Sequence, residues 1–338
     1  MIVLRRIVLL IPVLLGVTLV TFLLTRVIPG DPIASLISPQ ASPQVRRALI
    51  HQYGLDRSVI VQYFAYVGDL LHGDLGTSFS TSHAVLNDLV SRLGATFELT
   101  LYAMLVALAT GIPLGILAAV RRGRVIDHVS RIIATSGIAL PVFWTSLMLL
   151  YLFFFKAHIL PAPYGRINPR IDPPTDITGL YTIDSLLTGN WSALGSSAQA
   201  LALPVCVLAF GVMAPIARIT RSGMIEALDS DYVRAARSLG LQPRTVVLRH
   251  AFRNALMPLV TMVAVLYGYL LGGVVLVENV FAWPGLGNYV FNAITSNDYP
   301  AVQGFILYAT TIYVLLFLAV DLLFIAIDPR VRVGRAAR

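Results

Sequence analysis

Six long apolar runs dominate this sequence and decide what it can fold into. They occupy residues 7–28, 99–120, 132–155, 199–217, 259–277 and 305–327. An α-helix needs about 20 apolar residues to cross the ~30 Å hydrocarbon core of a bilayer, and each run is close to that length. The sequence therefore predicts an all-α integral membrane protein with six transmembrane helices.

The composition agrees with a membrane protein. Of the 338 residues, 57% are hydrophobic and only 12% are charged, whereas soluble domains carry roughly 25% charged residues. A net charge of +8 could indicate a nucleic-acid partner, but such a partner needs one solvated basic patch. Here the basic residues lie in short blocks between apolar runs, so we expect lipid and no nucleic acid as the surroundings that explain the charge.

The distribution of arginine predicts the orientation. Cytoplasmic segments of membrane proteins are enriched in Lys and Arg, and most of the 25 basic residues fall on one side if the N-terminus is cytoplasmic. The first apolar run follows Arg5 and Arg6 and could be a signal peptide, but it is longer than the usual 7 to 15 residues of such a segment. We therefore expect a retained first span and two cytoplasmic termini.

This topology divides the chain into three parts. Residues 1–28 hold the first span, residues 29–98 form an external segment with short surface helices, and residues 99–338 form a core domain with five further spans. Helices in the external segment are predicted from Ser42 and Pro43 onward and over residues 58–71. The core domain has external loops at 158–198 and 281–302 and a cytoplasmic loop at 218–258.

The sequence lacks the residues of several common chemistries. Lys156 is the single lysine and follows three phenylalanines, so the phosphate-binding loop GxxxxGK[ST] cannot occur. Cys206 is the single cysteine, which excludes a disulfide within the chain and a cysteine-based metal site. The six histidines show no zinc-binding spacing. We assign no catalytic residue, metal site or cofactor to the chain, and any ATP chemistry would belong to a partner.

Three acidic residues near the apolar runs have competing interpretations, because an intramembrane carboxylate can mark a proton or ion pathway. Asp321 precedes Asp328 by seven residues, and we expect it to pair with an arginine near the cytoplasmic face. Glu98 and Glu278 lie at the expected outer ends of two spans, where we expect hydrated carboxylates. Small residues at helix-packing spacing are expected to let helices approach closely. These are Gly111, Gly115, Ala119, Gly268 and Gly272.

The loop at residues 229–258 predicts two helices joined by a sharp turn. Asp229 and Asp231 suit a helix N-terminus, and about two helical turns can follow before Gly240. Gly240 suits the left-handed position that ends a helix. Pro243 fits the first turn of a second, basic helix.

This loop resembles a docking motif of known transporters. Residues 234–240 read RAARSLG and are similar to the EAAxxxG loop by which permease subunits of bacterial ABC importers contact their ATPase subunits. Arg234 stands where the general pattern has Glu, but DYVRxAR with a later RHAxRNAxxP resembles the dipeptide, oligopeptide and nickel branch. Leu239 departs from that branch, which usually has Lys there. Further segments resemble the branch in its order: Ile28-Pro29-Gly30-Asp31-Pro32, Gly73-Asp74-Leu75-Gly76, Thr220-Arg221-Ser222, Trp283-Pro284-Gly285-Leu286-Gly287, Asp298-Tyr299-Pro300 and Asp328-Pro329-Arg330.

The resemblance implies a type I ABC importer permease fold in the bacterial inner membrane and the import of short peptides, dipeptides in particular. It implies four kinds of contact: a second related permease subunit, two ATP-binding subunits that hold ATP and Mg, an extracytoplasmic solute-binding protein, and lipid. The expected ATPase-coupling residues are Asp231, Tyr232, Arg234, Ala235, Ala236, Arg237 and Gly240. The residues expected to face the binding protein or form a gate are Trp283, Pro284, Gly285, Leu286 and Gly287.

Two alternatives remain open. Within the family, the solute could be nickel or another small molecule. In a different class, the chain could be an ion-coupled carrier that works alone, which requires an ionisable residue at the membrane midplane or broken helices at matched positions. Neither feature is evident in the sequence.

Overall fold

A computed structural model describes residues 2–27, 42–52 and 54–327, and every regular element in these ranges is helical. The chain divides into two compact units. One comprises residues 1–94 and 285–338, and the other comprises residues 95–284. The motif Ile28-Pro29-Gly30-Asp31-Pro32, the closing Asp328-Pro329-Arg330 and the side chain of Asp321 lie outside what the structure describes.

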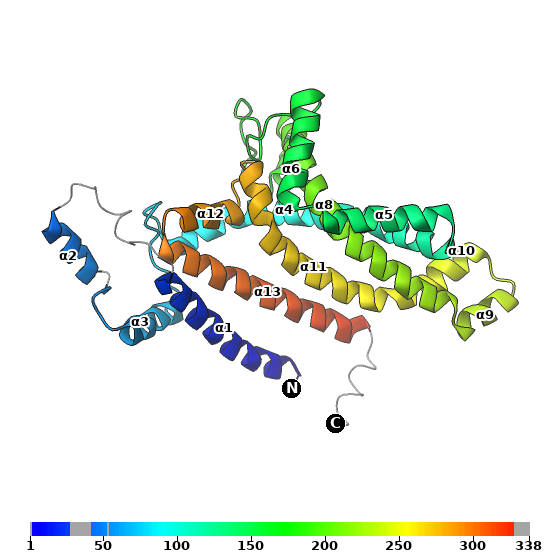
Figure 1. The fold of residues 1–338 in the computed structure, drawn as a ribbon, viewed down its shortest axis with the longest axis horizontal. Coiled ribbons are helices and arrows are strands. Elements are labelled where there is room, and N and C mark those ends of the chain that lie inside the picture. Colours follow the sequence, from blue (N-terminus) through cyan, green and yellow to red (C-terminus); the bar gives the residue numbers. More distant parts are fainter. Residues whose placement is uncertain (1, 28–41, 53, 328–338) are drawn as a thin grey trace. The chain divides into compact units, whose positions relative to one another are not determined.

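The first unit is built on two long helices that lie side by side, α1 (Ile2–Val27) and α13 (Tyr299–Ile327) (Figure 1). α2 (Pro43–Gln52) and α3 (Val59–Leu71) confirm that the two segments predicted to be helical in residues 29–98 form helices. The unit also holds the first turns of α4 (Val85–Val120) and the helix α12 (Leu286–Thr295). α12 packs on α13 and was not predicted, because its segment follows a turn signal and is too short to span.

A buried carboxylate joins two segments of the first unit that are far apart in sequence. Asp298 is fully buried, and its Oδ2 accepts hydrogen bonds from Ser78 Oγ at 2.6 Å and Ser80 N at 3.0 Å. Next to this contact, Gly76 has a φ of +82°, and a Cβ placed there would lie 3.4 Å from Pro300 Cβ. The segments Gly73–Gly76 and Asp298–Pro300 thus lie together in the fold.

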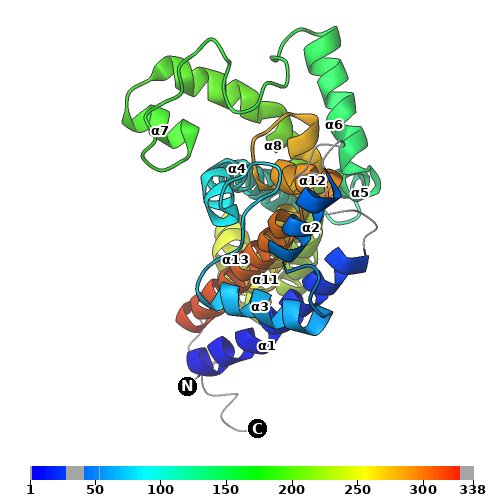
Figure 2. The same cartoon turned by 90° about the vertical axis from the view of Figure 1, so that its left-hand side faces the viewer.

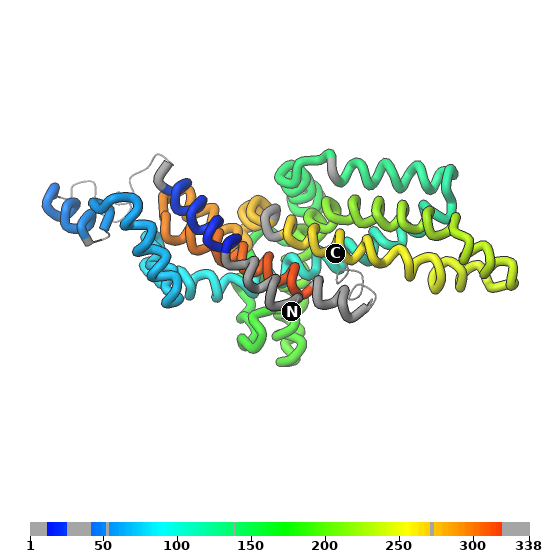
Figure 3. The backbone as a smooth tube through the Cα atoms, turned by 90° about the horizontal axis from the view of Figure 1, so that it is seen from below, coloured from blue at the N-terminus to red at the C-terminus, as the bar shows by residue number. Residues whose placement is uncertain are grey.

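The second unit is a helix bundle in which α5 (Val125–Ala139), α8 (Trp191–Leu228) and α11 (Phe252–Val280) run alongside one another, as Figure 3 shows. Its core is an apolar cluster contributed by α4, α8 and α11. The remaining elements are α6 (Val142–Leu150), a π-helical turn at Tyr151–Lys156, α7 (Tyr181–Leu187), α9 (Asp231–Ser238), α10 (Pro243–Thr245) and a second π-helical turn at Val246–Ala251.

Glycines let the helices of the second unit approach α8 at backbone distance. A Cβ on Gly111 would lie 2.9 Å from Ile216 Cγ2, and one on Gly115 would lie 2.6 Å from the Ala217 carbonyl oxygen. Gly137 of α5 is equally close to the Phe210 carbonyl oxygen, at 2.6 Å. The predicted packing role of Gly111 and Gly115 is therefore confirmed.

The predicted count of six spans is not confirmed. Within the described residues, four helices are long and apolar enough to cross a bilayer, or five if one bent pair counts as a single span. The break of the bent pair falls in the run 132–155, which was predicted as one helix, and the two halves of the pair meet at 100°. Figures 1 and 2 show α6 turning away from α5. Leu140 is extended at the break because Pro141 follows it, and a residue before proline disfavours the helical conformation.

The carboxylate of Glu98 is buried and anchors the loop 158–198, so its predicted hydration is wrong. The side chain is 1% exposed. Its Oε1 accepts hydrogen bonds from Thr182 N at 2.8 Å and Thr182 Oγ1 at 2.7 Å, and its Oε2 lies 2.7 Å from Arg166 Nη2. Arg166 also lies over the ring of Tyr181, 3.7 Å from its centroid. The proline-rich loop is thereby fixed to α4.

The second carboxylate, Glu278, is also fully buried, which corrects the same expectation. Its Oε1 accepts a 2.6 Å hydrogen bond from Thr96 Oγ1. One residue earlier on α4, the Ala95 carbonyl accepts a 2.9 Å hydrogen bond from Trp283 Nε1. The fold tolerates both buried carboxylates because hydrogen bonds within the protein replace their contacts with water.

We predict that Arg166→Ala lowers the free energy of unfolding by about 3–5 kcal/mol, because it leaves the buried Glu98 carboxylate without its counter-ion. The measurement is the unfolding of the purified protein in detergent. Arg170→Ala is the matched control, since Arg170 is an exposed arginine of the same loop and should change stability by less than about 0.5 kcal/mol. Equal effects of the two substitutions would contradict the anchoring role of Glu98.

Candidate functional site

The loop at residues 229–258 folds locally as predicted. α9 (Asp231–Ser238) has Asp231 in its first turn, and Gly240 follows it with a φ of +75°. No heavy atom lies within 4 Å of a Cβ placed on Gly240, so the left-handed backbone alone explains the preference for glycine there. Pro243 then occupies the first turn of α10, as the sequence indicates.

One face of α9 packs against the second unit. Val233 is fully buried and Ala236 is 7% exposed, and both join an apolar cluster with Ala119 of α4, Met224 of α8 and Ala255 of α11. An eight-residue helix is too short to be stable alone in water. Its attachment to this cluster therefore holds α9 in place.

The face of α9 next to the buried one carries apolar side chains toward the outside. Tyr232 is 43% exposed, Leu239 is 80% exposed, and Ala235 is exposed between them in the helical sequence. Tyr232 and Ala235 are three residues apart and lie on one stripe of the helix, and Leu239 follows the helix directly as its C-cap residue. Charged residues border the stripe, with an ion pair between Arg234 and Asp231. The arrangement is an exposed apolar ridge on a rigidly held helix.

The structure separates Ala235 from Ala236, which the sequence interpretation treated alike as contact residues. Ala236 faces the chain's own apolar cluster, whereas Ala235 is exposed. A substitution such as Ala236→Glu would therefore disturb internal packing and is a poor probe of a partner. Arg234, Arg237 and Asp231 are exposed on the same helix and remain available for a contact.

An ion pair between a buried carboxylate and a partly exposed arginine connects α5 to α8. Asp127 is buried in the first turn of α5, and its carboxylate oxygens accept hydrogen bonds from Arg221 Nε at 2.7 Å and Arg221 Nη2 at 3.0 Å. The backbone N–H of Gly123 donates to the same carboxylate at 3.0 Å. Arg221 belongs to the motif Thr220-Arg221-Ser222, so this part of the resemblance has a structural role that its sequence did not reveal.

The segment at residues 283–287, which was expected to face the binding protein or form a gate, is mostly buried. Trp283 is 1% exposed and lies in the apolar core of the second unit. Pro284 is exposed, whereas Gly285, Leu286 and Gly287 are buried. Because the indole is buried, Trp283→Ala would report on packing and is a poor probe of a partner. The role of the segment toward a binding protein stays a prediction. Pro284 is the exposed residue of the segment, so it is the one that could make such a contact.

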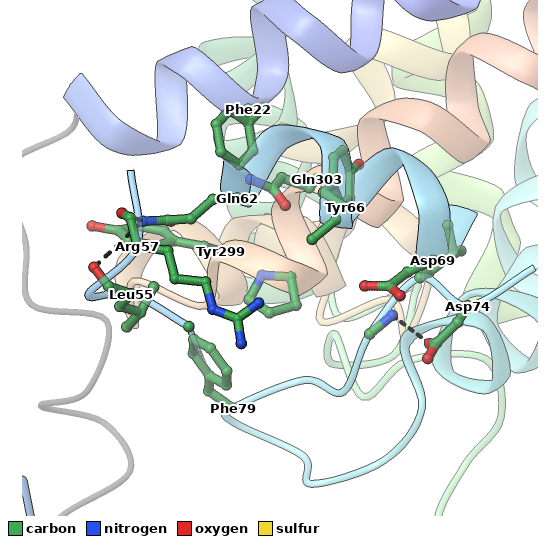
Figure 4. A pocket seen from close by; sticks show the side chains of 15 residues that line it. Phe22, Leu55, Arg57, Gln62, Tyr66, Asp69, Asp74, Phe79, Tyr299 and Gln303 are labelled. Carbon is green, nitrogen blue, oxygen red and sulfur yellow. Dashed lines mark hydrogen bonds between the residues drawn. The ribbon is translucent and has the colours of Figure 1, made fainter. Parts of the chain in front are cut away.

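A pocket in the first unit involves none of the predicted site residues. It has a volume of about 310 Å³, and α1, α3 and the start of α13 contribute to its lining. Figure 4 shows the guanidinium of Arg57 on one side and the carboxylates of Asp69 and Asp74 on the other. Burial, with a smaller contribution from neighbouring Tyr63, raises the pKa of Tyr66 in its wall to about 12.

Sequence reasoning missed the residues that hold these surfaces in place. The pairs Glu98–Arg166 and Asp127–Arg221 join residues 68 and 94 positions apart. A carboxylate at the end of an apolar run signals either hydration or burial with a partner, and only the fold decides between them. For Asp127, its position beside an arginine-rich turn was the one available signal.

Comparison with known proteins identifies the family. Residues 111–333 match the family described as binding-protein-dependent transport system inner membrane component, and residues 1–100 match the N-terminal region of the same kind of membrane component. The two matches together cover most of the chain. They also confirm the predicted all-α membrane fold, that of a type I ABC importer permease.

Named relatives align over nearly the full length of the chain. The dipeptide transport system permease protein of Alkalihalophilus pseudofirmus is 44% identical, over 97% of this chain and 98% of its own length. The dipeptide transport system permease protein of Escherichia coli K12 is 39% identical, over 98% of each chain. The glutathione transport system permease protein of Salmonella choleraesuis is 36% identical, again over 98% of each chain. The chain therefore belongs to the family of binding-protein-dependent transport system inner membrane components.

Proposed function

We propose that this chain is the permease subunit of an ATP-driven importer that moves short peptides, dipeptides in particular, into the cytoplasm. The family match supports a membrane transport component, and the names of the relatives support the solute class. A second, related permease subunit, two ATP-binding subunits with ATP and Mg, and an extracytoplasmic binding protein complete the proposed assembly. ATP hydrolysis belongs to the ATP-binding subunits, since this sequence contains no phosphate-binding loop.

The observation that carries this proposal is the exposed apolar ridge of α9. The ridge is exposed in this chain and consists of Tyr232, Ala235 and Leu239. A partner that covered it would bury apolar surface, and exposed apolar patches often mark such contacts. The helix is about 12 Å long, which suits a groove on a partner's surface. The face next to the ridge is fixed to helices α4, α8 and α11. A partner that holds the ridge would therefore act on the helices of the second unit.

The remaining expected coupling residues fit this contact as follows. Asp231, Arg234 and Arg237 surround the ridge with charge, and Gly240 ends the helix so that the basic segment can turn back toward α11. Ala236 contributes from inside by holding α9 to its support. We also propose the orientation in which this loop and both termini are cytoplasmic, because arginine is concentrated on that side.

We predict that the orientation can be read by thiol labelling in sealed cells. In a Cys206→Ser background, cysteines placed at the exposed positions Ser42 and Thr175 should react with an impermeant reagent, and one at exposed Gln242 should not. Permeabilised cells supply the control, because there all three sites should react. Labelling of Gln242 in sealed cells would overturn the orientation.

We predict that uptake of a labelled dipeptide into proteoliposomes needs the ATP-binding subunits and ATP. The permease pair alone should show no accumulation, because it has no source of free energy for concentrating the solute. Unlabelled dipeptides should compete, and Ni²⁺ should not. Accumulation driven by an ion gradient without the ATP-binding subunits would instead establish the carrier class, and competition by Ni²⁺ alone would establish the nickel alternative.

We predict that Ala235→Glu abolishes ATP-coupled uptake and lowers the amount of ATP-binding subunit that co-purifies with the permease. The substitution places bulk and charge on the exposed ridge, while the inner face of α9 keeps its packing. Ala235→Ser adds little volume at the same position and serves as the matched control, with uptake within about twofold of the original chain. If Ala235→Glu retains full coupled uptake, α9 is not the docking element.

A further inference from the structure

A second pocket opens among α4, α5 and α8, close to the arginine-rich end of the bundle. Its volume is about 160 Å³. The apolar part of its lining includes Leu114 and Ala118 of α4, Ala134 of α5 and Ala217 of α8. Leu114 and Ala118 precede the end of α4 at Val120 by six and two residues, which corresponds to about 3–9 Å along the helix. The pocket therefore lies within the last two turns of a span.

Three arginines surround the pocket. Arg131 of α5 and Arg218 and Arg221 of α8 all contribute to its lining. The acidic group that faces them is Asp127, which makes two hydrogen bonds with Arg221 at 2.7 and 3.0 Å and lies 3.9 Å from Arg131 Nε. One carboxylate against three guanidinium groups leaves a net positive charge at the mouth, and Arg218 is exposed there.

A polar group in the wall has no hydrogen-bond partner among the residues that the structure describes. Ser130 is 4% exposed, and its buried Oγ makes no hydrogen bond with any described residue. A serine in a helix can donate to the carbonyl four residues earlier, as Ser136 does to Ile132 at 3.0 Å, but Ser130 does not make this bond. A buried hydroxyl without a partner is costly, so its presence on the pocket wall points to an acceptor beyond the residues that the structure describes.

We propose that this pocket binds the phosphate headgroup of an anionic phospholipid. Arg218 and Arg131 would face the phosphate oxygens, Ser130 would donate to one of them, and the apolar wall of Leu114, Ala118 and Ala134 would contact the start of an acyl chain. Guanidinium groups form strong hydrogen bonds with phosphate, and basic pockets between transmembrane helices suit anionic headgroups. The apolar wall at membrane depth favours a lipid over a soluble phosphate ion.

The pocket lies between α5 and α8, on the part of α8 that precedes the helix α9. The lipid would contact α5 and α8 on either side of the Asp127–Arg221 pair, and α8 leads within ten residues of Arg221 to α9. A bound headgroup would thus stabilise the junction that supports the exposed ridge. This lipid site goes beyond the proposed transport function. Lipid binding and peptide uptake are measured separately, so the failure of one proposal does not decide the other.

The test is a native mass-spectrometry titration of the assembled, delipidated complex with phosphatidylglycerol. Arg218→Gln should raise the apparent Kd about tenfold and Ser130→Ala about fivefold, as expected for the loss of a charged and a neutral hydrogen bond. Arg124→Gln is the matched control: it removes the same charge from the same end of the bundle, but Arg124 is exposed and does not line the pocket. It should change the Kd less than twofold.

Two further measurements complete the test. One distinguishes a lipid headgroup from free phosphate, and the other distinguishes a loss of lipid binding in Ser130→Ala from a loss of stability. Millimolar inorganic phosphate should fail to displace phosphatidylglycerol, and phosphatidylcholine should bind at least tenfold more weakly. Without lipid, Ser130→Ala should unfold at the same or a higher temperature than the original complex, because it removes an unpartnered hydroxyl. Equal effects of Arg218→Gln and Arg124→Gln, displacement by phosphate alone, or an unchanged Kd in Ser130→Ala would each overturn the lipid site.

Discussion

The contact of neighbouring helices with the backbone of α8 is the constraint on which the second unit depends. In a bilayer, apolar side chains gain little by leaving lipid, so helices associate through close packing and hydrogen bonds. At Gly115 and Gly137 a single methyl group would lie 2.6 Å from a carbonyl oxygen of α8. Because the helices touch at these points, polar groups beyond the contact can meet as well. Arg221 reaches Asp127 at one end of α8, and Ser196 Oγ accepts a 2.9 Å hydrogen bond from Asn168 N toward the other.

Buried carboxylates order the loop 158–198, whose first part, up to residue 174, has too many prolines to form a regular element. Glu98 fixes it to α4 through Arg166 and Thr182. Within the loop, burial tends to raise the pKa of Asp184, but hydrogen bonds from Thr178 and from neighbouring backbone N–H groups outweigh it and hold that pKa below its usual range. The ionised form of Asp184 therefore stabilises the loop at neutral pH, and this contribution is lost only as the pH falls through the lowered pKa.

Local chemistry explains which parts of the structure the sequence could predict. Gly240 and Pro243 specify the turn after α9 through their own backbone preferences, and both were predicted at their correct places. The break at Pro141 carried the same kind of signal, but the surrounding apolar run outweighed it in the prediction of one span. The burial of Trp283, Glu98 and Ala236 depends on segments tens of residues away, and no pattern near these residues reports which segment will cover them.

The attachment of α9 also determines how a force on it spreads. Val233 and Ala236 share one apolar cluster with residues of α4, α8 and α11, so α9 cannot swing on its turns as a flexible tether without opening that cluster. A close-packed interior has little compressibility. A displacement of α9 by about an ångström would therefore move the ends of α4, α8 and α11 together, and these helices would carry the movement along their length.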